Sequence, residues 1–271
     1  MTARTQPSCT DALDRFAAEL LDATTSLTPV KPLRDRLDHM DLTDAYYVQT
    51  AQLEHHVAAG RVLAGRKVGL TSLAMQRQLG VDSPDFGFFF EDMVHHDDAR
   101  IPASQFIQPK VEPEFGFVLK EPLQGPGVTL EQAAAAIGAI YPAIEIIDSR
   151  ITNWDIRLVD TVADNASCGA IAVGTHPLDL DLGDPVALMD VTCSLVIDGE
   201  VTGSGTGADV MGHPLAPLAW LANVLGEQGV ALEAGQLILP GSFTAAMPVV
   251  ADSTATADFG PLGSLTIHFT D

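Results

Sequence analysis

The sequence is poor in basic residues and in cysteine, and it contains no long uninterrupted hydrophobic run. Its 271 residues include 14 lysines and arginines against 36 aspartates and glutamates, a formal net charge of −22. A surface of this charge repels nucleic acid and anionic lipid, so we expect neither as a partner. A small acidic substrate would need a local positive charge or a bound cation in its site.

The few cysteines limit the compartment and the fold. Cys9, Cys168 and Cys193 are an odd number without CxxC spacing, which argues against a disulfide framework or a zinc knuckle. Residues 1–30 lack the basic and apolar regions of a secretory signal. The most apolar segment, 210–226, is interrupted by prolines and is predicted to be a buried helix rather than a membrane span. We therefore expect a cytoplasmic protein.

Several common functional motifs are also missing. No GxGxxG opens a helix and no GxxxxGK[ST] is present, so nothing indicates nucleotide binding. The pairs His55–His56 and His95–His96 lack metal-ligand spacing such as HExxH. Ser167 in DNASCG lacks the GxSxG context of a nucleophile elbow, so a serine hydrolase is not expected.

Helical patterns come first in the chain and β-type patterns dominate later. A helix beginning at Thr10 and another over 43–59 precede Gly60, a residue typical of the position after a helix end. Short β-type runs then outnumber two further helices. Because strands and helices do not alternate one for one, we predict an α+β fold with a curved mixed sheet. Residues 1–60 are expected to be a helical segment of the same unit as residues 61–271.

Local signals refine this prediction. Thr129 and Gln132 have capping-box spacing at the start of one later helix, and Pro214 is a suitable first residue for the other. Asp198-Gly199 between alternating runs predicts a β-hairpin with a type I′ turn.

The stretch PKVEPEFGFVLKE, residues 109–121, places two glutamates inside a β-type pattern. Because side chains alternate along a strand, Glu112 and Glu114 share one face and lie about 6–7 Å apart, close enough to bind one cation. Pro113 between them predicts an edge strand or a bulge. A solvated outer face is the ordinary alternative for such a pair.

A third glutamate follows in the run YPAIEIIDS. Glu145 has Ala143 and Ile147 as its neighbours on the same strand face, which is unusual for a solvated face. Glu145 follows Glu114 by 31 positions, which leaves room for a helix and a return strand in the same sheet. Three carboxylates from neighbouring strands suit Mg²⁺ or Mn²⁺, with open positions for water and substrate.

Lys67 and Asp85 are two further candidates. Lys67 in AGRKVGLTS shares a strand face with Gly69, which leaves it room to reach a ligand, although an exposed strand lysine is the commoner case. Asp85 in SPDFG is either a turn residue or a carboxylate beside apolar rings, where a raised pKa would suit acid–base chemistry.

These motifs together resemble the hydratase/decarboxylase family related to the C-terminal domain of fumarylacetoacetate hydrolase. The similarity rests on GRKVGLTS, QLGVDSPDFG, PKVEPEFGFVL, YPAIEIIDSRI, DNASCGAIAVG and GHPLAPLAWLANVL, in this order. Within that family they are most similar to the 2-keto-4-pentenoate hydratases of aromatic meta-cleavage pathways. The resemblance implies a mixed β-roll that assembles into homo-oligomers and associates with other enzymes of its pathway.

The resemblance also implies a site. In the family the ExE pair and the later glutamate bind Mg²⁺ or Mn²⁺, which corresponds to Glu112, Glu114 and Glu145 here. The family lysine of the GxKxG stretch and the family aspartate of PDFG correspond to Lys67 and Asp85, expected to be catalytic, while Ser167 is an expected substrate contact. The implied reaction is the addition of water to 2-hydroxypenta-2,4-dienoate, which gives 4-hydroxy-2-oxopentanoate.

Three alternatives stay open at this point. A decarboxylase of 2-oxo-3-hexenedioate would use the same metal, but those relatives carry Pro-Ile-Tyr/Phe-Gly where this chain has PDFG, which favours water addition. A C–C hydrolase of acylpyruvates would need a His–Glu pair that we do not find. A catalytically idle partner subunit would use the acidic residues only as a structural cation site or a solvated surface.

Overall fold

The computed structural model describes residues 10–72, 76, 83–181 and 185–271. The sequence also predicts a short helix from Ser72 to Gly80, and most of it lies outside these residues. The helices are α1 (Thr10–Ser26), α2 (Leu42–Ala58), α4 (Leu130–Ala136), α5 (Leu158–Ala163), α6 (Pro185–Asp190) and α7 (Leu215–Gly226). The strands are β1 (Leu63–Gly69), β2 (Asp85–Phe90), β3 (Val94–His96), β4 (Arg100–Pro102), β5 (Lys110–Leu119), β6 (Ile137–Ile147), β7 (Cys168–Val173), β8 (Thr192–Ile197), β9 (Glu200–Thr206), β10 (Leu237–Leu239), β11 (Met247–Pro248), β12 (Thr254–Asp258) and β13 (Ser264–Thr270).

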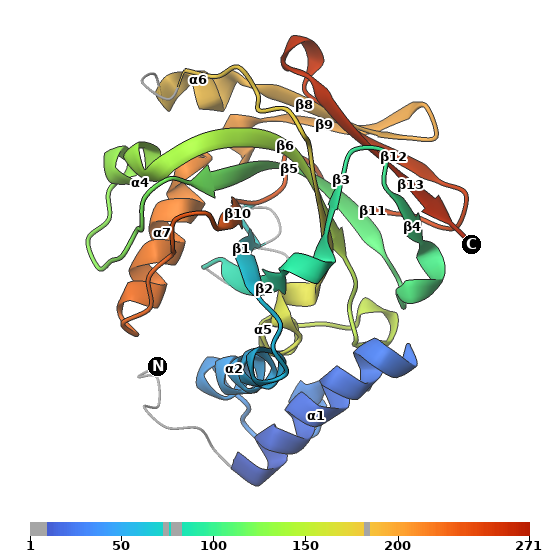
Figure 1. The fold of residues 1–271 in the computed structure, drawn as a ribbon. Helices are drawn as coiled ribbons and strands as arrows, with labels where there is room; N and C mark the ends of the chain where they lie inside the picture. The colour runs from blue at the N-terminus through green and yellow to red at the C-terminus, as the bar shows by residue number, and fades with distance from the viewer. Residues whose placement is uncertain (1–9, 73–75, 77–82, 182–184) are drawn as a thin grey trace.

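The strands form two mixed sheets. The larger has the order β2-β1-β10-β5-β6-β7-β3, with β11 paired to β5, and the smaller has the order β4-β13-β12-β8-β9. Parallel pairs such as β1–β10 occur beside antiparallel pairs such as β5–β6. The predicted α+β fold with a mixed sheet is therefore confirmed. In Figure 1 the smaller sheet lies against the larger one, while α1 and α2 lie together on the far side from β8 and β9.

The larger sheet curls until β2, at one end, meets the turn Asn165–Ser167 that precedes β7. The Asn165 side chain, directly before β7, accepts a hydrogen bond from Phe88 N and donates one to Phe88 O, both at 2.8 Å. An amide side chain thus replaces a strand partner for β2 at the seam. The inner face of this roll is lined by an apolar cluster that includes Phe89, Ala143 and Leu239.

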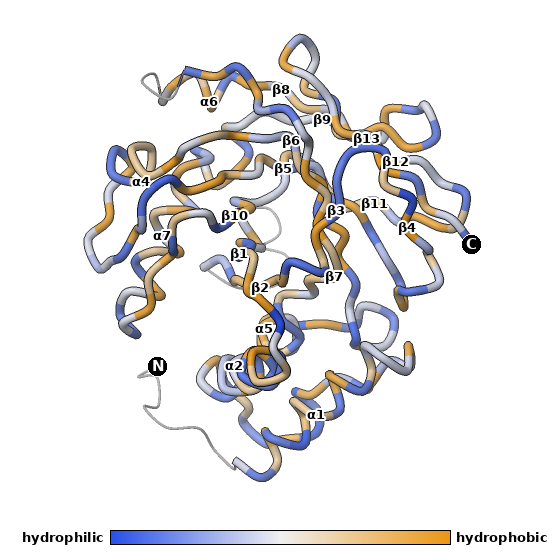
Figure 2. The backbone as a smooth tube through the Cα atoms, in the orientation of Figure 1, coloured by the Kyte–Doolittle hydropathy of each residue, from blue (hydrophilic) through white to orange (hydrophobic). Residues whose placement is uncertain are grey.

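The outer face of the roll packs against the smaller sheet. Phe115 of β5 stacks on Phe259 with ring centroids 5.6 Å apart, in a core shared by both sheets. This core accounts for the alternation predicted in β5: Val111, Phe115 and Phe117 face it, and the glutamates face the inside of the roll. Figure 2 shows hydrophobic residues along the strands of both sheets.

The helical segment covers the roll near β2. One stripe of α1 is buried against α2 and α5, and the alternation of hydrophobic and hydrophilic residues along α1 is visible in Figure 2. On α2, Gln49 donates hydrogen bonds to Phe86 O of β2 and to Val162 O of α5. Among the described residues, no helix combines the length and apolarity needed to span a membrane. The predicted division at residue 60 stays a prediction.

Most local predictions are confirmed. Thr129 and Gln132 form the capping box of α4, Gly60 follows α2 with φ +87°, and the Asp198-Gly199 turn joins β8 to β9. One prediction is wrong: Pro113 is neither on an edge strand nor in a bulge, because β5 lies between β10 and β6. Its ring is tolerated because that side of the strand faces the irregular segment between β10 and β11, where Phe243 N donates to Pro113 O.

Candidate metal and active site

The three predicted metal ligands lie together inside one end of the roll. Glu112 of β5 is directly opposite Glu145 of β6, and Glu114 pairs with Ala143 one step further along. One carboxylate oxygen from each glutamate lies within 4.8 Å of the others. Glu114 and Glu145 are buried and Glu112 is half-buried. We call these three residues the carboxylate cluster.

The carboxylate cluster fits a divalent cation. Neither oxygen of Glu145 has a hydrogen bond of acceptable geometry, although both are buried. Glu114 is held by the backbone of Gly241, whose N–H donates to Glu114 Oε2 over 2.6 Å. Buried carboxylates are costly unless positive charge offsets them, and the one ammonium of Lys67, 3.1 Å from Glu145 Oε1, cannot balance three glutamates. Three oxygen donors from two strands match the preference of Mg²⁺ or Mn²⁺.

Lys67 and Asp85 join the carboxylate cluster from neighbouring strands. Lys67 is buried, not exposed, and its Nζ lies 3.1 Å from Glu145 Oε1. Asp85 begins β2 opposite Gly69 and is buried, so it is not a turn residue. A Cβ on Gly69 would lie 2.3 Å from Asp85 Oδ1 and 3.4 Å from Lys67 Nζ. The missing side chain at Gly69 therefore makes room for both groups, as the sequence predicted for Lys67.

The two oxygens of Asp85 differ in their surroundings. Oδ2 accepts a hydrogen bond of 3.4 Å from the Thr161 hydroxyl of α5, while Oδ1 is buried without a hydrogen bond. Burial raises the pKa of Asp85, and the nearby Lys67 charge only partly opposes this shift. Asp85 therefore has an unpartnered oxygen and a tendency to hold a proton, both of which suit proton transfer.

Burial and mutual repulsion dominate the electrostatics of the carboxylate cluster. Burial raises the pKa of Glu112 to about 7, with a further contribution from the charge of Glu145. Burial also raises the pKa of Glu114 and of Glu145, although Lys67 opposes the shift at both. For Lys67, burial alone would lower the pKa, but the charges of Glu145 and Asp85 outweigh it and raise the pKa above its ordinary value. Lys67 thus carries a positive charge.

Ser167 lies near the site but apart from the carboxylate cluster. Within the described part of the chain, Ser167 donates two hydrogen bonds to Asp164: its Oγ to Oδ2 over 3.4 Å, and its backbone N–H to the carbonyl oxygen. Its own carbonyl oxygen accepts a hydrogen bond from Asp148 N. Asn165, Ala166 and Ser167 all have φ near +50°, a left-handed turn that is costly for residues with a Cβ. Such strain is often kept at functional positions. The role of Ser167 as a substrate contact stays a prediction.

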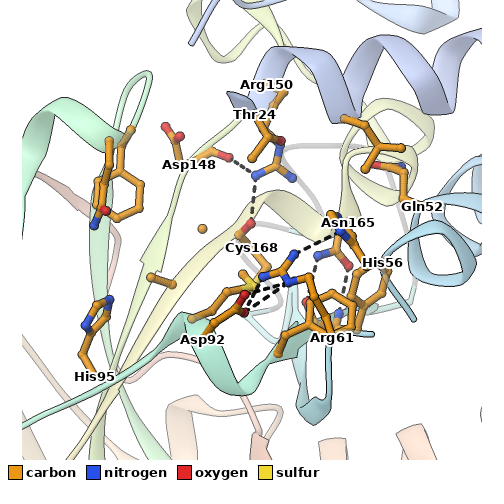
Figure 3. Close-up of a pocket in the computed structure, with 18 residues that line it drawn as sticks. Thr24, Gln52, His56, Arg61, Asp92, His95, Asp148, Arg150, Asn165 and Cys168 are labelled. Atoms are coloured by element: carbon orange, nitrogen blue, oxygen red, sulfur yellow. Dashed lines mark hydrogen bonds and ion pairs between the residues drawn. The ribbon is translucent and has the colours of Figure 1, made fainter. Parts of the chain in front are cut away.

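A cavity of about 220 Å³ lies behind the start of β7, between α1, α2 and the roll (Figure 3). Its two arginines are already paired. Arg61 contacts Asp92, and Arg150 contacts Asp164 and donates a hydrogen bond of 2.8 Å to Cys168 O. Burial raises the pKa of the Cys168 thiol, which is also near the Glu145 and Lys67 charges. Arg150 therefore anchors the strand that passes beside the carboxylate cluster.

Sequence reasoning missed Gly241, Thr161 and Cys168 as neighbours of the site. Thr161 contacts Asp85 across 76 positions of the chain, and Gly241 contacts Glu114 across 127. No local pattern marks such pairs. The proline-glycine pair at 240–241 was the available signal, since it indicates a turn after a short strand. At the start of α7, His213 Nδ1 accepts a hydrogen bond from Leu215 N.

The chain has relatives among known proteins. The family model for the fumarylacetoacetate (FAA) hydrolase C-terminal domain matches residues 55–269. The chain belongs to this family. A 2-hydroxyhexa-2,4-dienoate hydratase of Comamonas testosteroni is 40% identical over 93% of this chain and 95% of its own length. A 2-keto-4-pentenoate hydratase of Paraburkholderia xenovorans is 40% identical, with 94% of each chain covered. The resemblance found in the sequence motifs is confirmed.

Solved structures of the family have the same architecture. A 4-oxalocrotonate decarboxylase of Pseudomonas putida G7, complexed with magnesium and adipate, is 33% identical with a TM-score of 0.92, over 98% of this chain and all of the other. The same enzyme was also solved with calcium and acetate. A fumarylpyruvate hydrolase of Pseudomonas aeruginosa, 17% identical with a TM-score of 0.60 over 77% of this chain and 90% of that one, shares the fold.

Proposed function

We propose that the protein is a metal-dependent hydro-lyase that adds water to 2-hydroxypenta-2,4-dienoate and gives 4-hydroxy-2-oxopentanoate. One observation carries the proposal: the buried carboxylate cluster lies beside Lys67 and Asp85 in a chain about 40% identical to hydratases of 2-hydroxydienoates. The reaction belongs to the meta-cleavage breakdown of aromatic compounds, as the resemblance implied.

The proposed cofactor is Mg²⁺ or Mn²⁺, held by Glu112, Glu114 and Glu145. When bound, the cation supplies a Lewis acid for the carboxylate and C2 oxygen of the substrate and offsets negative charge that develops there. A magnesium-complexed relative with the same fold supports this choice. The cation also places positive charge within a site that would otherwise repel an acid.

Lys67 and Asp85 are the proposed proton carriers. Conversion of the dienol to its 2-oxo form moves a proton from the C2 hydroxyl to carbon, and water addition at C4 needs a proton taken from water. Asp85 Oδ1 is buried without a hydrogen bond, and Lys67 Nζ carries a positive charge within 3.1 Å of Glu145. Asp85 therefore provides a proton acceptor and Lys67 a positively charged donor, and the geometry leaves open which proton each one moves.

Decarboxylation of 2-oxo-3-hexenedioate is the second candidate function, favoured by the TM-score of 0.92 to the decarboxylase. That reaction shares the chelating 2-oxo acid end but removes a carboxylate from the other end. Two features support hydration instead: the identity to hydratases exceeds the 33% identity to the decarboxylase, and Asp85 stands in the PDFG stretch.

A direct assay distinguishes the two functions. Purified protein with Mg²⁺ is incubated separately with 2-hydroxypenta-2,4-dienoate and with 2-oxo-3-hexenedioate. We expect the first substrate to be consumed with formation of 4-hydroxy-2-oxopentanoate. Carbon dioxide released from the second substrate, without hydration of the first, would assign the protein to the decarboxylases. If neither reaction occurs while Mg²⁺ still binds, the idle-partner alternative is favoured.

Assembly and location remain part of the proposal. We expect a cytoplasmic homo-oligomer that associates with other enzymes of its pathway, as the family resemblance implied. Size-exclusion chromatography with light scattering measures the oligomer, and a monomer would contradict this expectation.

A further inference from the structure

The carboxylate cluster opens toward solvent at the start of β5. Along the inner face of this strand, Lys110 and Glu112 are half-buried, whereas Glu114 is 1% exposed. Lys110 is two residues before Glu112, and two residues span about 6.6 Å along a strand. Lys110 also pairs with Ile147, the last residue of β6 beyond Glu145. An anion that approaches the carboxylate cluster from this side therefore passes Lys110.

The ammonium of Lys110 is held in place by an aromatic ring. Its Nζ lies 4.1 Å from the centroid of Trp154, in the short 3₁₀ turn Thr152–Trp154 that follows β6. This distance is well within the range of a cation–π interaction. The indole N–H donates a hydrogen bond of 3.1 Å to Gln108 O, which fixes the ring beside the start of β5.

The support beneath the ring is itself anchored. Gln108 N donates to Asp148 Oδ1 over 2.7 Å, and its amide donates to Ser149 O and Ile151 O. The segment that carries Trp154 is thus tied to Gln108, two residues before β5 begins. A charge at the end of an ordinary lysine side chain moves freely, whereas this one is positioned relative to the carboxylate cluster.

We propose that the Lys110 ammonium, held over the Trp154 ring at the entrance, attracts the acidic substrate to the carboxylate cluster. This inference rests on the proposed function, because it assumes that the ligand is an anion. The need for such a charge follows from the formal net charge of −22 on the chain. A positive charge at the mouth of a site raises the local concentration of anions and their rate of entry, and salt weakens the effect.

The test compares three variants of the Mg²⁺-loaded protein. Lys110→Gln removes the charge with little change in length, and Lys110→Arg keeps both the charge and the contact with an aromatic ring. Lys120→Gln is the matched control, because Lys120 is exposed just beyond the other end of β5 and its loss changes the net charge equally. Melting temperatures establish that each variant folds.

Oxalate, a small dianion with a 2-oxo acid end, is the probe, and calorimetry gives its dissociation constant. We expect Lys110→Gln to weaken oxalate binding about three- to tenfold at an ionic strength of about 0.01 M, and less than about twofold at 1 M. The oxalate dissociation constants of Lys110→Arg and Lys120→Gln should stay within about twofold of the parent value at both ionic strengths. The inference would be overturned if Lys110→Gln and Lys120→Gln lost oxalate affinity equally, or if the loss of affinity in Lys110→Gln did not change with salt.

Turnover separates this inference from the proposed function. With 2-hydroxypenta-2,4-dienoate, Lys110→Gln should raise KM by the same factor as the oxalate dissociation constant and leave kcat within about twofold. A parallel fall in kcat would instead place Lys110 in the chemistry and contradict a role in attraction. The parent protein could show no hydration of the dienoate and still bind oxalate in a way that depends on Lys110. In that case the proposed function fails and this inference stands.

Discussion

At the scale of single residues, the site contains more negative charge than it can neutralise by itself. Asp85, Glu112, Glu114 and Glu145 supply four carboxylates, and Lys67 supplies one ammonium, so full ionisation leaves −4 + 1 = −3 in a buried space. A divalent cation reduces this imbalance, as does a proton retained on one of the carboxyl groups. The predictions for single residues follow from which carboxyl group holds the proton and which ones bind the cation.

Replacement of Asp85 by asparagine should separate chemistry from stability. Burial raises the pKa of Asp85, so the fold disfavours its charge and should tolerate a neutral amide of the same shape. We expect Asp85→Asn to lower kcat by about 10²–10⁴ with an unchanged or higher melting temperature. Steady-state kinetics and calorimetry measure both quantities, and the exposed Asp190→Asn is the control. A kcat within about tenfold of the parent would exclude Asp85 from proton transfer.

Replacement of Glu145 by glutamine should abolish the response to Mg²⁺. At about 100 times its dissociation constant a ligand stabilises a protein by about 2.7 kcal/mol, which corresponds to a rise of about 5–10 °C in melting temperature for a chain of this length. We expect that rise in the parent and in the exposed control Glu200→Gln, but not in Glu145→Gln. The same rise in all three proteins would mean that Mg²⁺ binds elsewhere.

The sequence predicted the members of this site better than their contacts. Alternation along β5 placed Glu112 and Glu114 on one face, and the apolar neighbours of Glu145 indicated a buried carboxylate. The hydrogen bond from Gly241 to Glu114 could not be predicted, because it depends on how the segment after β10 folds back across the roll. The pairing of Lys110 with Trp154 has the same origin. Contacts set by chain closure leave no periodic signal.

At the scale of elements, the site depends on how the roll closes. The strands β1, β2, β5 and β6 carry the functional side chains, and β7 passes beside them. The patterns predicted the strand and helix types but not the seam, where an asparagine side chain takes the place of a strand partner. The error at Pro113 has a related cause: the sequence cannot show that its side of β5 faces an irregular segment rather than a strand.

Removal of the Asn165 side chain should affect both stability and activity. Its two hydrogen bonds to Phe88 join β2 to the turn that contains Ser167. We expect Asn165→Ala to lower the free energy of unfolding by about 2–3 kcal/mol and to lower kcat/KM, because two buried backbone groups lose partners and the turn loses its support. Denaturant unfolding and steady-state kinetics measure the two effects.

The chain offers a matched control for this variant. Asn223 of α7 makes the same pair of bonds to the backbone of Val128, away from the carboxylate cluster. Asn223→Ala should cost a similar stability, about 1–3 kcal/mol, and leave kcat/KM within about twofold. An equal loss of activity in both variants would show that stability alone, and not the position of the turn, accounts for the effect of Asn165.

At the scale of the whole molecule, the buried carboxylates link folding, pH and metal binding. Burial raises the pKa of Glu112 from 4.5 to about 7 in the metal-free fold. Between these values the folded chain retains a proton that the unfolded chain has released, so the free energy of unfolding falls as pH rises through this window. A metal ion binds the deprotonated carboxylates, and its stabilisation should therefore increase over the same window.

We expect the pH dependence of stability to change when Mg²⁺ is added. Without the metal, Glu112→Gln should gain stability relative to the parent as pH rises from about 5 to about 8, because glutamine releases no proton on unfolding and adds no charge to the carboxylate cluster. With saturating Mg²⁺ the parent should be more stable than the variant near pH 8, because the parent gains the free energy of metal binding and the variant has lost a metal ligand. Differential scanning calorimetry of both proteins, with Mg²⁺ or with a chelator, measures the two trends. Parallel pH profiles for parent and variant in chelator would show that Glu112 titrates alike in the folded and unfolded chain, which would contradict a buried, repulsive cluster.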